Sequence, residues 1–152
     1  MALPRIKIAK DKAELVRKLL DEPGMTGMFA TYADVVAFAA SFGVKHQKRS
    51  PLMEVSQSEP APISLEVFIS RGYERMLNLI AITTTADIKI LSSEDEAARV
   101  LIFEEYANGG LEKLQQELRG AVDYTDRIVL NLNAERFSRE ESDEEFDLSR
   151  FL

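Results

Sequence analysis

The stretch "TYADVVAFAASFG", residues Thr31–Gly43, sets the fold class because it combines a strongly apolar composition with the signals of a helix. Thr31 is a favoured N-cap residue, and Asp34 follows three positions later as a weak capping-box partner. Gly43 readily adopts the left-handed conformation that ends many helices. The sequence therefore predicts a buried helix that begins after Thr31 and ends at Gly43.

Upstream of this helix, "PRIKIA" (residues 4–9) alternates polar and apolar residues, as a strand does, and its Arg5 and Lys7 face outward. Residues 10–24 have helical spacing and end at a Pro–Gly pair. Strand, helix and helix in this order are typical of a ribbon–helix–helix DNA-binding unit, in which two chains pair their strands. An unpaired strand edge is unfavourable, so we expect residues 5–9 to pair with a second copy in a homodimer. A strand followed by two helices inside an ordinary helical fold is the alternative.

Downstream, apolar spacing predicts further helices at 72–84, from Ser93 to Gly109–Gly110, at 111–118 and at 121–133. Residues 63–70 fit a helix or a strand. The predicted fold class is therefore mainly α: a short N-terminal β-strand followed by a helical bundle, with a ribbon–helix–helix-like start. We expect a single mostly helical domain over 1–134 and an acidic C-terminal tail over 135–152, extended or loosely packed.

Charge is divided unevenly along the 152 residues, whose net charge is −7. Residues 1–50 hold nine Lys and Arg against five Asp and Glu, whereas residues 51–152 hold ten against twenty-one. Cations gather in the basic segment, defined here as Lys45–Arg49. Exposed cations can neutralise DNA phosphates, and the following residues are the candidates for DNA binding: Arg5, Lys7, Lys10, Lys45, Lys48 and Arg49. The alternative is a charge cluster that only stabilises the end of a helix.

Catalytic and metal-binding patterns are missing from the sequence. The chain has no Cys and one His, His46, and the cations beside this side chain disfavour a bound metal ion. Adjacent carboxylates such as Glu104 and Glu105 point about 100° apart on a helix and do not converge. We therefore expect no catalytic residue, no metal site, no cofactor and no enzymatic activity. Without a signal peptide or an apolar run of the roughly 20 residues that a membrane span needs, a cytoplasmic protein is expected.

Four blocks of the chain together resemble the small DNA phosphorothioation-associated proteins of bacteria. The blocks are "LPRIKIAKDKAELVRKLL", "TYADVVAFAASFGVKHQKRSPL", "GYERMLNLIAI" and "FEEYANGGLEKLQQEL". The resemblance covers most of residues 3–125. It implies a place in a DNA modification or restriction system that puts sulfur into the DNA backbone or restricts DNA lacking it, and it implies no particular reaction.

The residues and the resemblance together predict a non-enzymatic accessory protein that binds double-stranded DNA through a basic N-terminal face. The acidic tail is expected to compete with DNA for this face. Two alternatives stay open. One is a protein–protein adaptor whose acidic half docks a basic nuclease or modification enzyme, and the other is a ribbon–helix–helix-type transcriptional regulator.

Overall fold

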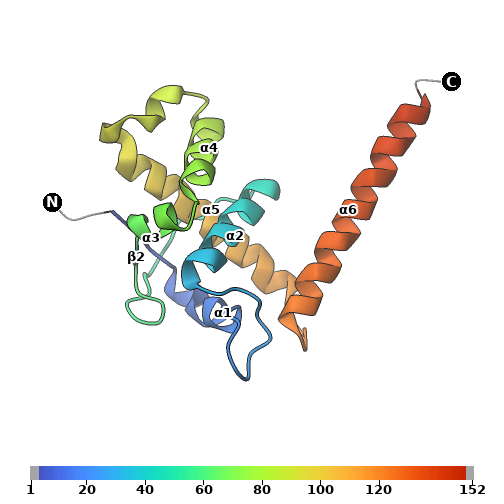
Figure 1. The fold of residues 1–152 in the computed structure, drawn as a ribbon, viewed down its shortest axis with the longest axis horizontal. Coiled ribbons are helices and arrows are strands. Elements are labelled where there is room, and N and C mark those ends of the chain that lie inside the picture. The colour runs from blue at the N-terminus through green and yellow to red at the C-terminus, as the bar shows by residue number, and fades with distance from the viewer. Residues whose placement is uncertain (1–3, 150–152) are drawn as a thin grey trace.

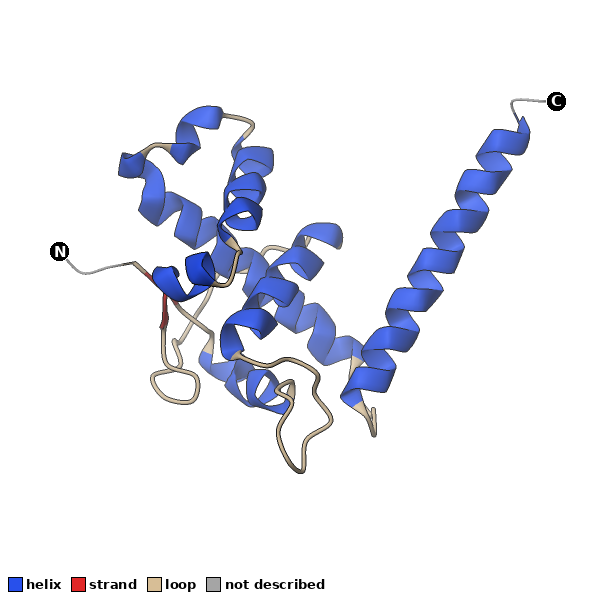
Figure 2. Cartoon of the chain, viewed as in Figure 1, coloured by secondary structure: helices blue, strands red, loops and turns tan. Residues whose placement is uncertain are grey.

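The fold is organised around two long helices that cross closely at its centre, α2 (Tyr32–Lys45) and α5 (Glu96–Glu117) (Figure 1). The computed structural model describes residues 4–149, with side chains described for residues 4–138. Helices dominate the described chain, as Figure 2 shows, and the sheet consists of two very short strands. The predicted mainly α fold class is therefore confirmed.

The other elements are placed around this central pair. At the N-terminal side lie β1 (Arg5–Ile6), the 3-10 turn η1 (Lys10–Lys12) and α1 (Ala13–Lys18). A long connection leads from α2 to β2 (Ile63–Ser64), α3 (Leu65–Ser70) and α4 (Glu74–Thr85), so residues 63–70 contain both a strand and a helix. The turns η2 (Ile88–Leu91) and η3 (Ser93–Asp95) precede α5, and α6 (Tyr124–Ser149) follows it.

Helix α2 begins as its sequence predicts. The Asp34 backbone N–H donates to Thr31 Oγ1 and the Thr31 N–H donates to Asp34 Oδ2, both at 3.2 Å, which completes the capping box. Its end differs from the prediction, because the helix continues past Gly43 to Lys45. The residue with positive φ that follows this helix is Gln47, at 52°. The prediction that Gly43 ends the helix is therefore wrong.

Glycines permit the close crossing of α2 and α5. A Cβ atom on Gly110 would lie 1.8 Å from the carbonyl oxygen of Ala39, and one on Gly43 would lie 2.1 Å from that of Tyr106. Both distances are far shorter than atoms tolerate, so only hydrogen fits at either position. The predicted helix end at Gly109–Gly110 is wrong, and α5 runs unbroken through both glycines into the segment expected to form a separate helix. These glycines serve close packing and not a turn.

Strand β1 pairs within its own chain. It is antiparallel to β2, with Arg5 opposite Ser64 and Ile6 opposite Ile63. The connection that follows α2 continues the pairing, because the Ser56 N–H donates to the Ile8 carbonyl at 2.8 Å. The predicted pairing with a second copy is therefore wrong, and with it the ribbon–helix–helix-like start. The partner strand has two residues and follows a Pro- and Ser-rich stretch, so its own sequence pattern is too short to be read.

Helix α6 is longer than predicted. It continues to Ser149, so the end of the chain that was expected to be extended is helical as far as that residue. Residues 150–152 lie outside the described part. Figure 1 shows α6 projecting away from the other helices. The domain boundary expected at residue 134 stays a prediction.

A buried carboxylate joins β1 to α5. Glu104 is 5% exposed, and its Oε2 accepts the Lys7 backbone N–H at 2.6 Å. Burial raises the pKa of Glu104, and this effect outweighs the opposing effects of that hydrogen bond and of the Lys7 charge. A carboxyl group with a raised folded-state pKa contributes stability at low pH and loses it as pH rises through that pKa.

Glu104→Gln is accordingly expected to be as stable as the wild type or more stable at pH 7. The amide oxygen still accepts the Lys7 N–H, while the buried charge is removed. Its advantage should disappear below about pH 4, where the wild-type carboxyl group is itself protonated. Thermal unfolding across this pH range measures the difference. A variant that is less stable than the wild type at pH 7 and equal to it at low pH would contradict the expectation.

Candidate functional site

The basic segment lies where the chain leaves α2 and crosses α5. Lys45 is the last residue of α2, and Lys48 and Arg49 belong to the loop beyond it. The three cations therefore do not lie on one loop, because Lys45 belongs to the helix. Gly109 allows the crossing, because a Cβ atom there would lie 2.0 Å from the Lys48 carbonyl oxygen. The loop is also held by the Ser50 N–H, which donates to the carbonyl oxygen of Glu105 at 3.0 Å.

The three candidate cations of the basic segment are all ion-paired with glutamates of α5 or α6. Lys45 contacts Glu135, and Lys48 Nζ lies 3.4 Å from Glu112 Oε2. Two nitrogens of Arg49 donate to Glu105 Oε1, Nε at 3.0 Å and Nη2 at 2.7 Å. The guanidinium carbon of Arg49 also lies 5.8 Å from the centre of the Tyr106 ring. The positive charge of this segment is thus largely neutralised inside the chain.

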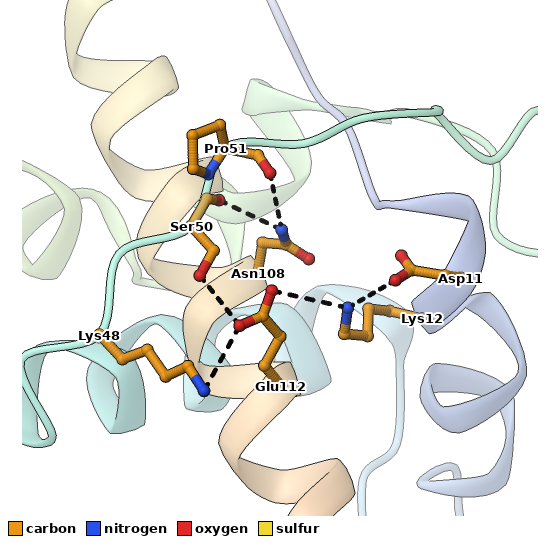
Figure 3. A network of polar contacts seen from close by, with 7 residues as sticks. All are labelled: Asp11, Lys12, Lys48, Ser50, Pro51, Asn108 and Glu112. Carbon is orange, nitrogen blue, oxygen red and sulfur yellow. Dashed lines mark hydrogen bonds and ion pairs between the residues drawn. The ribbon is translucent and has the colours of Figure 1, made fainter.

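Glu112 is the centre of the polar network in Figure 3. Its Oε2 accepts the Ser50 hydroxyl at 3.0 Å, beside the Lys48 ammonium. Its Oε1 lies 3.9 Å from Nζ of Lys12. The Lys12 residue is only 3% exposed, and its Nζ has a second partner in Asp11 Oδ2 at 2.9 Å. The buried Lys12 charge is thereby compensated by two carboxylates. The network brings the N-terminal part of the chain and the basic segment to one glutamate.

Asn108 fixes the end of the loop that carries the basic segment. This side chain is 5% exposed, and its Nδ2 donates to the carbonyl oxygens of Ser50 at 3.1 Å and Pro51 at 3.2 Å. Amide hydrogen bonds to two successive carbonyls fix the path of a backbone that has no regular structure. The positions of Lys48 and Arg49 relative to α5 therefore depend on Asn108 as well as on the ion pairs.

The N-terminal candidates Arg5, Lys7 and Lys10 are exposed. Lys10 Nζ lies 3.6 Å from Glu54 Oε2, an ion pair between side chains that are mostly in solvent. Such pairs contribute only about 0–1 kcal/mol, so another anion can displace them. Lys7 and Arg49 are both held by α5, through the neighbouring residues Glu104 and Glu105. Sequence reasoning missed these glutamates as partners, because contacts between residues so far apart in the chain leave no local pattern.

Helix α6 is attached to the body through its first turns. Ile128 is 3% exposed, and Thr26 accepts the Tyr124 N–H at 2.9 Å through its Oγ1. Arg127 donates to the Glu117 carbonyl at 3.3 Å, and farther along the helix Glu135 contacts Lys45. These contacts cover one side of the helix only.

Another side of α6 is exposed and apolar. Leu130 is 64% exposed and Phe137 is 63% exposed, with exposed Ala134 between them. The positions i, i+4 and i+7 lie on one face of a helix, and we call these three residues the α6 stripe. From residue 135 to 147 the sequence holds seven acidic residues against two arginines. The stripe therefore leads into a strongly acidic part of the helix.

These features define a class: a small, mainly helical protein whose basic segment is ion-paired internally and whose last helix projects from the body. No helix in the described part is long and apolar enough to cross a membrane. The family model described as DNA sulphur modification system-associated protein 4 matches residues 5–151, and the chain belongs to this family. The expected association with a DNA sulphur modification system is confirmed by that match. Searches of curated proteins and of solved structures found no match.

Proposed function

We propose that the chain is a non-enzymatic adaptor of a DNA sulphur modification system, which binds a basic protein of that system through α6. The observation that carries the proposal is the internal pairing of Lys45, Lys48 and Arg49 with Glu135, Glu112 and Glu105. A surface whose cations are already paired with carboxylates has little positive potential left to attract phosphates. Since the family description names an association with the system, binding to another of its proteins fits this chain.

The α6 stripe supplies the chemistry for such binding. Exposed apolar residues at i, i+4 and i+7 are the pattern with which helices enter apolar grooves of partner proteins. The acidic residues that follow favour a groove bordered by Lys or Arg, which speeds the encounter and selects the partner. The partner proposed is therefore a protein with an apolar groove and a basic rim.

The adaptor function predicts that substitutions in the α6 stripe weaken binding to the partner protein. Leu130→Ser combined with Phe137→Ser should weaken binding to the partner by at least about tenfold, because buried apolar anchors contribute most of the energy of such interfaces. The measurement is a titration of the full chain with each purified protein of the same system. Leu79→Ser is the matched control, since Leu79 is 61% exposed on α4, and it should leave the affinity unchanged. Equal binding by the wild type and the double variant would refute the assignment to α6.

DNA binding is the second candidate, favoured by the exposure of Arg5, Lys7 and Lys10. In that case Lys45, Lys48 and Arg49 would exchange their glutamate partners for phosphates. The two candidates differ in salt dependence. If the three cations contact phosphates, replacing all of them with Ala flattens the slope of log affinity against log salt by roughly two to three units on duplex DNA. The adaptor predicts an unchanged slope, or no duplex binding by either protein.

The transcriptional regulator is not proposed. Its ribbon–helix–helix interpretation required strand β1 to pair with a second copy, and β1 pairs with β2 of its own chain.

A further inference from the structure

We propose that His46, Glu117 and Glu135 form a binding site for a divalent transition-metal ion, of which Zn²⁺ is the best example, and that the bound ion fastens α6 to α2 and α5. His46 follows the last residue of α2, Glu117 is the last residue of α5, and Glu135 lies in the fourth turn of α6. Each offers one ligand atom, and these atoms all lie within 4.8 Å of one another. An imidazole with two carboxylates is a donor set that suits Zn²⁺ and its first-row neighbours, whereas Mg²⁺ and Ca²⁺ prefer oxygen alone.

The imidazole of His46 gives an independent reason to look for a ligand here. Its Nε2 is inaccessible to solvent and has no hydrogen-bond partner among the described residues. A buried nitrogen without a partner is unfavourable and calls for an explanation. A carboxylate oxygen, Glu135 Oε1, lies 3.4 Å away. Two ligands of a tetrahedral zinc ion are separated by about 3.4 Å when each bond is about 2.1 Å, so this pair already has the required spacing.

The surroundings of the three residues resemble the outer shell of a metal site. Glu135 uses its other oxygen, Oε2, for Lys45, which leaves Oε1 available. Glu117 Oε2 accepts the Asn131 amide at 3.3 Å. The His46 ring is held against Phe42, with their centres 4.4 Å apart. Hydrogen bonds to ligating carboxylates and packing of the imidazole fix ligand orientation in known metal sites.

The charges around His46 explain why the sequence alone argues against a metal site here. The neighbours of His46 in the sequence are cations, which disfavour a metal ion. Folding adds the carboxylates of Glu117 and Glu135, which lie 71 and 89 positions away along the chain. Lys45 and Lys113 pair with these two carboxylates, so both ammonium groups compete with a bound cation.

The test uses the full chain without a histidine tag, freed of metal with a chelator and titrated with Zn²⁺ in a calorimeter. We expect saturable binding of one ion per chain and a higher melting temperature with zinc. His46→Gln, Glu117→Gln and Glu135→Gln should each lower the affinity at least about tenfold, because changes in the shell outside the ligands already cost 10–100-fold. Glu94→Gln, at an exposed position on η3, is the matched control and should bind zinc as the wild type does.

A second readout needs no variant. His46 is the only histidine of a chain without cysteine, so every imidazole nitrogen signal in a ¹⁵N NMR spectrum belongs to it. Zinc should strongly shift the signal of one of the two ring nitrogens. This shift should reach its limit at the same zinc-to-protein ratio as the heat signal of the calorimetric titration. Binding that leaves both imidazole signals in place would overturn the proposal. So would the absence of saturable binding at micromolar zinc, which would identify the contact of His46 with Glu135 as a contact between side chains without a metal ion.

Discussion

Gly110→Ala should unfold the protein or destabilise it by about 3 kcal/mol or more, although alanine is the better helix former. On an exposed helix this change stabilises by about 1 kcal/mol, because glycine loses more backbone freedom on folding. Here the new Cβ atom would lie 1.8 Å from the carbonyl oxygen of Ala39. Since that oxygen belongs to the backbone of α2, the two central helices must separate, and overpacking of this kind costs 1–3 kcal/mol or more. Urea unfolding followed by circular dichroism measures the loss.

Gly24→Ala provides the control for this experiment. A Cβ atom at Gly24 would meet nothing within 4 Å, so the change tests only the left-handed backbone, whose φ is 83°. The expected cost is about 1 kcal/mol. A Gly110 variant that loses no more stability than the Gly24 variant would show that α2 and α5 can separate easily, which would contradict the role assigned to the glycines.

Asp34→Ala is expected to lower the free energy of unfolding by about 3 kcal/mol, because one carboxylate accepts hydrogen bonds from three different residues. Besides the capping box with Thr31, Arg71 donates Nε to Oδ1 at 2.8 Å and Nη2 to Oδ2 at 2.7 Å. The Tyr73 hydroxyl donates to Oδ1 at 2.5 Å. The carboxylate therefore joins the start of α2 to the connection between α3 and α4, and its side chain is only 12% exposed.

The Asp34 contribution should depend on pH in a defined direction. Burial raises the pKa of Asp34, but the hydrogen bonds from Arg71, Tyr73 and Thr31 outweigh that effect and lower it to about 2. A lowered folded-state pKa means that the stability is present above the unfolded value, near pH 4, and is lost as pH falls through about 2. This shift corresponds to about 2 kcal/mol. The stability difference between the wild type and Asp34→Ala should therefore shrink between pH 5 and pH 2.

Two further variants make the Asp34 prediction specific. Asp34→Asn keeps the shape of the side chain without its charge, so it should be intermediate in stability and lack the pH dependence below pH 4. Asp21→Ala removes an exposed aspartate and should change stability by no more than about 0.5 kcal/mol. If Asp34→Ala behaved like Asp21→Ala, the bonds to Arg71 and Tyr73 would contribute little in solution.

Features that depend on a few neighbouring residues could be predicted from the sequence. The capping box at Thr31 and Asp34, the buried apolar character of α2 and the mainly α fold class all follow from local spacing and composition. Glycine was the main source of error, because the same residue permits a left-handed turn or a close helix crossing. Gly43 and Gly110 serve the crossing, and which of the two uses applies depends on α5 and α2 meeting at these positions.

The candidate site shows the same division between local and distant information. The basic segment is visible in the sequence as a group of cations, and the family resemblance is visible in several blocks. The partners of those cations are glutamates 56 to 90 positions away, as for Arg49 with Glu105 and Lys45 with Glu135. The partner of β1 is likewise supplied by β2, more than fifty residues along the chain. Charge and periodicity can be read from neighbouring residues, whereas ion pairing and strand pairing depend on which residues lie close together in space. The glutamates reach their cations only because α5 and α6 pack against α2.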